Sequence, residues 1–150
     1  MANKMAFKTP CLVCVEDAKK RKKLFEWACE IGYVAAYRIN EYYPVLSTAL
    51  TQDCIDICPK SIIENLVDYG AIDCGTDIEL FKALAAMNDE NDREQWFIIT
   101  ADVYCDLPPG HMFKCQPHPS QWHVGASIDP MYCRKATTEE IIEHFNTTHL

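Results

Sequence analysis

Short apolar runs alternate with helical segments that carry start and stop signals, and this alternation constrains the fold of the chain more than any other feature. Residues 11–15 follow a proline and form an apolar, β-branched run typical of a buried strand. From Asp17 to Ile31 the apolar side chains recur at helical spacing, and Gly32 supplies a stop signal. Residues 33–39 are again aromatic and β-branched. The four features predict a β-α-β opening.

The middle of the chain continues the pattern. A helix is expected to begin near Pro59 and to end at Gly70, with an apolar face made of Ile62, Ile63, Leu66 and Val67. Residues 71–74 then predict a short strand. Residues 40–58 give no clear assignment beyond a short strand near 54–57.

Two capping boxes predict where later helices begin. Gly75 turns the chain, and Thr76 with Glu79 would open a largely apolar helix that runs to about Asn88 and is the most buried of the chain. Thr137 with Glu140 would open the final helix. That helix is expected to dock onto a sheet through Ile141, Ile142 and Phe145.

These segments predict one α/β domain over residues 1–150, with a mixed sheet packed against three to four helices. The sheet is expected to contain the strands near Leu12, Val34, Ile72 and Phe97. Residues 101–133 hold five of the eight prolines and predict an irregular β-rich C-terminal lobe, with turns at 108–110 and 129–130.

Charge is distributed unevenly along the chain. Residues 1–40 contain eight Lys or Arg and four Asp or Glu, whereas residues 41–150 contain six and eighteen, which gives the net charge of -8. A mostly acidic surface repels phosphate backbones, so general nucleic-acid binding is not expected. No apolar run is long enough to cross a bilayer, and the first residues lack the apolar core of an export signal. A cytoplasmic protein is expected, with its nine cysteines as free thiols.

Two stretches resemble a known group of proteins. One runs from Asp73-Cys-Gly-Thr through residues 80–92 to Gln95-Trp-Phe97, and the other covers residues 134–145. They resemble small uncharacterised accessory proteins encoded by phages and prophages of gut bacteria. The resemblance covers about a quarter of the chain. It implies a phage accessory protein that acts inside a host cell, and it implies no activity and no catalytic residues.

A candidate anion site combines two helix starts. Gly75 and Thr76 stand where a helix N-terminus would present free N–H donors to an anion. The run Lys19-Lys20-Arg21-Lys22-Lys23 lies on the first turns of an earlier helix, and both helices follow strands. We therefore take Gly75, Thr76, Lys19, Lys20 and Lys23 as candidate ligand-binding residues. The alternatives are a structural cap at Thr76 and a solvated lysine face.

Cysteines and histidines suggest a second, weaker hypothesis. A zinc site built from Cys105, Cys115, His118 and His123 is an alternative to the expectation of no metal. Cys74 stands at a strand end, but no spacing ties it to a histidine as a catalytic pair. No cofactor and no enzymatic activity are therefore expected.

The functional hypothesis is a non-enzymatic accessory protein that binds a host or phage protein. A localised basic helix on an acidic body offers two distinct faces, and aromatic residues in the irregular segments are typical interface anchors: Tyr42, Tyr43, Trp122 and Tyr132. The alternative is a protein that binds a nucleotide or a phosphorylated metabolite. Assembly into a homo-oligomer stays open.

Overall fold

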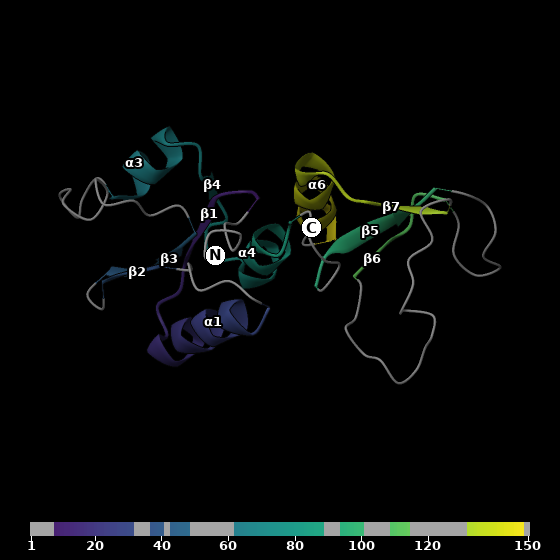
Figure 1. The fold of residues 1–150 in the computed structure, drawn as a ribbon. Helices are drawn as coiled ribbons and strands as arrows, with labels where there is room; N and C mark the ends of the chain where they lie inside the picture. Colours follow the sequence, from purple (N-terminus) through teal and green to yellow (C-terminus); the bar gives the residue numbers. More distant parts are fainter. Residues whose placement is uncertain are drawn as a thin grey trace. The chain divides into compact units, whose positions relative to one another are not determined.

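The structure is a computed structural model, and it describes residues 8–31, 37–40, 43–48, 62–88, 94–100, 109–114 and 132–148. The chain divides into two compact units, Met1–Met87 and Asn88–Leu150, and each unit has its own sheet. Each unit combines strands with helix (Figure 1), so the predicted α/β class is confirmed. That the two units make up a single domain stays a prediction.

The first unit contains a four-stranded mixed sheet in the order β2-β3-β1-β4. Its strands are β1 (Cys11–Cys14), β2 (Tyr37–Asn40), β3 (Tyr43–Ser47) and β4 (Ile72–Asp73). β4 pairs with β1 in parallel, whereas β3 pairs antiparallel with both β1 and β2. The predicted β-α-β opening is present, but β3, from the segment that gave no clear assignment, lies between its two strands.

A proline in the inner strand β3 explains why an arginine is buried beside it. Val15 lies opposite Pro44 where the β1–β3 register continues, and the Val15 N–H donates to the Pro44 carbonyl (2.6 Å). A residue so paired normally returns a hydrogen bond from its own N–H, which proline lacks. The guanidinium of Arg21, only 6% exposed, donates to the Val15 carbonyl instead and also to the Glu16 carbonyl (3.1 Å). Arg21 therefore completes the hydrogen bonding at the end of β1.

Helix α1 (Ala18–Glu30) follows β1, as predicted. Asp17 is its N-cap, and the Asp17 carboxylate accepts a hydrogen bond from the Lys19 backbone N–H (2.8 Å). The helix buries Leu24 and Ala28 on the same side as Arg21. Its position fixes which members of the basic run face solvent.

Helix α4 (Ile78–Ala85) is strongly buried, as predicted, through Leu80, Phe81, Ala83, Leu84 and Ala85. Its predicted start was wrong by one residue, because Asp77 and not Thr76 is the N-cap and accepts from the Leu80 N–H (3.0 Å). The cause is the preceding turn, in which the Asp73 carboxylate accepts from the Gly75 N–H (2.8 Å) and holds Gly75 at φ +61°. This turn delays the helix. The helix also ends at Ala86 rather than near Asn88.

Helix α3 (Ile62–Asp68) ends at Gly70, as predicted. The Gly70 N–H donates to Val67 (2.9 Å) and the Ala71 N–H donates to Leu66 (2.9 Å), which is the Schellman arrangement with glycine at positive φ. The predicted apolar face was wrong in part. Leu66 is fully buried, but Ile63 and Val67 are 40% and 43% exposed because only one side of this short helix packs against the unit.

The second unit contains a three-stranded antiparallel sheet in the order β6-β5-β7. Its strands are β5 (Trp96–Ile99), β6 (Met112–Lys114) and β7 (Cys133–Lys135). The predicted strand around Phe97 is present as β5, but it does not belong to the first sheet. It pairs instead with the two strands that follow it in sequence, which is the commoner arrangement for neighbouring elements. Phe97 and Ile99 form a small core with Cys133.

The predicted capping box at the start of α6 (Thr138–Thr148) is confirmed in both directions. The Glu140 N–H donates to the Thr137 hydroxyl (3.2 Å), and the Thr137 N–H donates to the Glu140 carboxylate (2.9 Å). Phe145 packs edge-on against Trp96 of β5, with ring centroids 5.4 Å apart. Ile141 is buried as predicted, but Ile142 lies on another side of the helix and lines an open groove.

Several predicted features lie outside the described residues: the helix start at Pro59, the strand near 54–57, Val34, and the turn at 129–130. The turn at Gly110 is present, with a positive φ and an N–H that donates to Ile99 (2.7 Å). Among the helices that the structure describes, none has the length and apolar character that a bilayer crossing requires.

Candidate functional site

The basic run of α1 separates into an inward and an outward part. Arg21 faces the sheet and is buried, whereas Lys19, Lys20, Lys22 and Lys23 are exposed. At 100° per residue, Lys20 and Lys23 lie on the side of α1 that also carries Trp27, and Lys22 lies on another side. The helix therefore presents two of its lysines beside an indole ring.

A hollow of about 160 Å³ lies between α1 and α4, which are neighbours in the first unit (Figure 1). Helix α1 contributes four of its lining residues, and α4 contributes two from successive turns. The lining residues are Lys20, Lys23, Leu24, Trp27, Ile78 and Lys82. We call this feature the lysine hollow.

The charged side chains that line the lysine hollow are all lysines. Lys20, Lys23 and Lys82 line it and no carboxylate among the described residues does, while most of the lining surface is apolar. Within the described part of the chain, neither Lys20 nor Lys23 forms an ion pair. The Lys82 ammonium lies 5.4 Å from the centroid of the Trp27 ring, within the range of a cation–π contact. Like charges brought together in this way raise the energy of the empty protein, so an anion would be attracted to the hollow.

Trp27, which lines the lysine hollow, carries a buried hydrogen-bond donor without a partner among the residues that the structure describes. This donor is its indole N–H. A buried donor without a partner is uncommon and destabilising by about 1–3 kcal/mol.

The structure brings together only some of the predicted ligand-binding residues. Lys20 and Lys23 line the hollow, whereas Lys19 is exposed on α1 and is not among the lining residues. Gly75 and Thr76 are exposed in the turn before α4 and do not line it either. The Gly75 N–H is already bonded to Asp73, so it is not available to an anion.

Two lining residues, Trp27 and Lys82, were missed in the sequence. Trp27 stands four residues after Lys23, and Lys82 stands four residues after Ile78, so each shares a helix face with a neighbour that lines the hollow. Helical periodicity was thus a usable signal for each face separately. Nothing in the sequence indicated that the two faces meet.

Cys74, the cysteine at a strand end, is buried in the first unit. Hydrogen bonding to Cys11, together with burial, raises the pKa of the Cys74 thiol, which disfavours the thiolate needed for nucleophilic attack. The alternative zinc ligands Cys105, Cys115, His118 and His123 lie outside the described residues. Among the residues that are described, no group of three metal-ligating side chains occurs.

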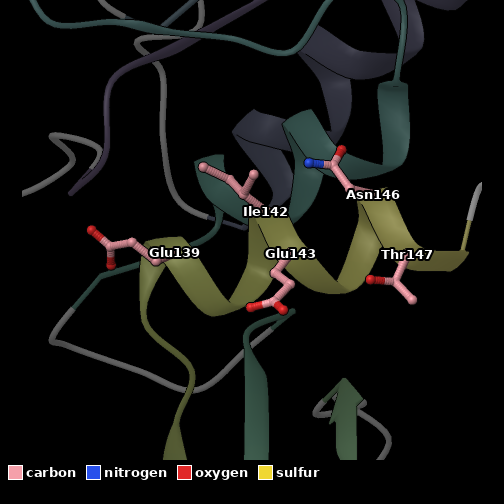
Figure 2. A pocket seen from close by; sticks show the side chains of 5 residues that line it. All are labelled: Glu139, Ile142, Glu143, Asn146 and Thr147. Carbon is pink, nitrogen blue, oxygen red and sulfur yellow. The ribbon is translucent and has the colours of Figure 1, made fainter.

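The second unit has two open cavities beside α6. One, of about 370 Å³, runs along the outer side of the helix, where Figure 2 shows Ile142 among polar side chains: Glu139, Glu143, Asn146 and Thr147. The other, of about 420 Å³, is lined by Ile98 and Met112 from the sheet and by Arg134 and His144 among its polar residues. Both are wide. The first is lined by two carboxylates and no cation, and the second by side chains of both charges, so neither gathers positive charge as the lysine hollow does.

An ion pair borders the larger of these cavities. Arg134 and Glu140 form two parallel hydrogen bonds of 2.8 and 2.7 Å, and Arg134 lowers the pKa of the Glu140 carboxyl from 4.5 to about 2. Glu140 is also a member of the capping box of α6. Both groups are therefore committed to holding the helix start, which leaves little of their hydrogen-bonding capacity for a ligand.

Comparison with known proteins gives no relative to add to this geometry: no protein-family model, no curated protein and no solved structure matches the chain.

Proposed function

We propose that this chain is a non-enzymatic binding protein that engages an anionic group of a protein partner through the lysine hollow. One observation carries the proposal. Lys20 and Lys23 of α1 and Lys82 of α4 line one hollow, and no carboxylate of the residues that the structure describes lines it. Lysines distributed only for solubility would be interspersed with acidic residues, as they are on most protein surfaces.

Folding alone does not account for this arrangement. Cations in the first turns of a helix oppose its dipole, and three ammonium groups around one hollow repel each other. No acidic residue stands in the first turn of α1, and the Asp17 cap before it offsets the cations only in part. A charge pattern that weakens the free protein is explained if a bound anion neutralises it.

Size and surface favour a protein partner over a nucleotide. Pockets that enclose drug-sized ligands measure about 300–1,000 Å³, and the hollow, at about 160 Å³, is smaller. Helix α3 of the same unit exposes Ile63 and Val67 one turn apart, and Tyr69, just after the helix, is 55% exposed. Exposed apolar side chains that neighbour one another are typical of protein interfaces. The resemblance to phage accessory proteins favours a host or phage protein as this partner.

A small anionic ligand is the second candidate function. The hollow accepts one anionic group whether or not that group is attached to a polypeptide, so a phosphorylated metabolite satisfies the same charges. The two candidates differ in whether a free anion binds as strongly as a peptide that carries it.

A titration with a short glutamate-rich peptide tests the proposed function. We expect peptide addition to shift the backbone amide resonances of α1 and α4 in ¹⁵N-labelled protein, and we expect salt to weaken the effect. The Lys20→Ala/Lys23→Ala variant should lose this response. The Lys19→Ala/Lys22→Ala variant is the matched control, because it removes the same charge from the same helix outside the hollow. Equal loss in both variants, or shifts spread over the whole surface, would contradict the proposal.

A further inference from the structure

We infer that the anionic group that fits the lysine hollow is a phosphate monoester, carried on a phosphorylated side chain of the partner. This inference rests on the proposed function and specifies its ligand chemistry. It starts from the kind of cation present. The hollow is lined by lysines and holds no arginine. Arginine is suited to planar, two-pronged recognition of a carboxylate, whereas lysine binds phosphate as a compact point charge.

The number of charges points the same way. A carboxylate brings one negative charge and neutralises one of the three ammonium groups. A phosphate monoester carries a charge of about -1.5 to -2 at neutral pH and presents three acceptor oxygens. Lys20, Lys23 and Lys82 together carry three positive charges, which a phosphate monoester matches more closely than a carboxylate does.

The volume of the hollow limits what accompanies the phosphate. At about 160 Å³ it takes a phosphoryl group, but it does not also enclose a base and a sugar. The rest of the ligand must then lie over the surface of α1 and α4, as a polypeptide can. A phosphodiester backbone is a poorer fit, because each of its phosphates carries one charge and the chain beyond residue 40 is strongly acidic.

Binding of a phosphate monoester should change the environment of Trp27. The Lys82 ammonium lies over the Trp27 ring in the empty protein, and a phosphoryl oxygen would attract it away from the ring. The Trp27 indole resonance therefore reports on occupancy of the hollow, and the Trp96 indole in the second unit serves as an internal reference.

The test compares three peptides of one sequence that carry phosphoserine, glutamate or serine at a single position, together with inorganic phosphate. We expect the phosphoserine peptide to bind roughly tenfold or more tightly than the glutamate peptide, with a shift of the Trp27 indole resonance. Its affinity should fall as the pH drops below about 6, where the phosphate loses its second charge. The ionisable side chains that line the hollow from α1 and α4 are Lys20, Lys23 and Lys82, and no histidine or carboxylate of the described residues lines it, so the second ionisation of the phosphate is expected to set the pH dependence.

The outcomes separate this inference from the proposed function. Equal binding of the phosphoserine and glutamate peptides would overturn the phosphate assignment and leave the protein-partner proposal intact. Binding of inorganic phosphate as strong as that of the phosphoserine peptide would support the phosphate chemistry and overturn the protein partner. Tighter binding of a single-stranded oligonucleotide than of the phosphoserine peptide would overturn the inference. Loss of phosphoserine binding in Lys20→Ala/Lys23→Ala but not in Lys19→Ala/Lys22→Ala would support it.

Discussion

Helices α1 and α6 both begin just after a strand, but their first turns carry opposite charge. α6 has Glu139 and Glu140 in its first turn, where negative charge is favourable beside the helix dipole. α1 has no acidic residue there and starts a run of five basic residues instead, with only the Asp17 cap to offset them. The residues of α6 thus stabilise their own helix, whereas those of α1 do not.

The side chains at the two helix starts also differ in the interactions that they make. In α6 the hydrogen bonds of Thr137 and Glu140 are local and secure the helix itself. At the start of α1 the side chains instead interact with more distant parts of the unit. Arg21 donates to the Val15 carbonyl at the end of β1, and Lys20 and Lys23 line the lysine hollow. The cations at the start of α1 oppose the helix dipole, and Arg21 among them makes a tertiary contact instead.

The largest effect should follow from Arg21→Met. The substitution keeps an unbranched apolar stem but leaves the Val15 carbonyl without a donor, and a buried unsatisfied polar group costs about 1–3 kcal/mol. We expect the free energy of unfolding to fall by about 2 kcal/mol, measured by denaturant titration. Thermal unfolding provides a second measurement if the variant is only partly folded at room temperature.

Pro44→Ala supplies the matched control for this prediction. Alanine has the N–H that proline lacks and can donate to Val15 itself, so Arg21→Met should cost about 1 kcal/mol less in the Pro44→Ala background. The same loss in both backgrounds would show that Arg21 stabilises the protein by some route other than the Val15 carbonyl.

A smaller effect, dependent on pH, is expected at α6. The pKa of Glu140 is about 2 in the folded protein and near 4.5 when unfolded, so the unfolded chain takes up a proton first as the pH falls. The stabilisation is therefore complete above about pH 5 and disappears as the pH approaches 2. Because the Glu140 side chain is 33% exposed, solvent screening limits the contribution to about 1 kcal/mol.

Glu140→Gln tests this pH dependence directly. The variant should unfold more easily than the native protein at pH 7 and equally easily near pH 2, as followed by denaturant titration across that range. Glu143→Gln removes the same charge from an exposed position of α6 and should show a flatter difference. A constant difference between the native protein and Glu140→Gln at all pH values would contradict a role for the carboxylate charge.

The features that the sequence predicted correctly are those that depend on neighbours in the chain. The capping box of Thr137 and Glu140 and the glycine stop at Gly70 are both set within a few residues, and both are confirmed. Thr76 was wrong because two local motifs compete there, and the Asp73 turn takes precedence over the capping box.

The features that the sequence could not supply depend on contacts between distant segments. The inward position of Arg21 follows from Pro44, a residue in a strand that had no clear signal. The lysine hollow follows from the adjacency of α1 and α4, so Lys82 could not be associated with Lys20 and Lys23 beforehand. The basic run was recognised as a candidate site, but its division into one structural arginine and two lining lysines required the fold.

The smallest predicted effect bears most directly on the comparison of α1 with α6. If Lys20 and Lys23 are kept for binding, Lys20→Ala/Lys23→Ala should raise the free energy of unfolding by about 0.5 kcal/mol, because it relieves repulsion in the hollow and the unfavourable position of Lys20 beside the helix dipole. Lys19→Ala/Lys22→Ala removes a similar unfavourable interaction with the helix dipole but leaves the lysines of the hollow in place. Its free energy of unfolding should therefore rise less at low ionic strength. High salt screens the repulsion between lysines and should bring the two variants together. A Lys20→Ala/Lys23→Ala protein less stable than the native one at low salt would instead mean that the lysine stems serve mainly to pack against Trp27 and Leu24, and that the first turn of α1, like that of α6, is organised for stability.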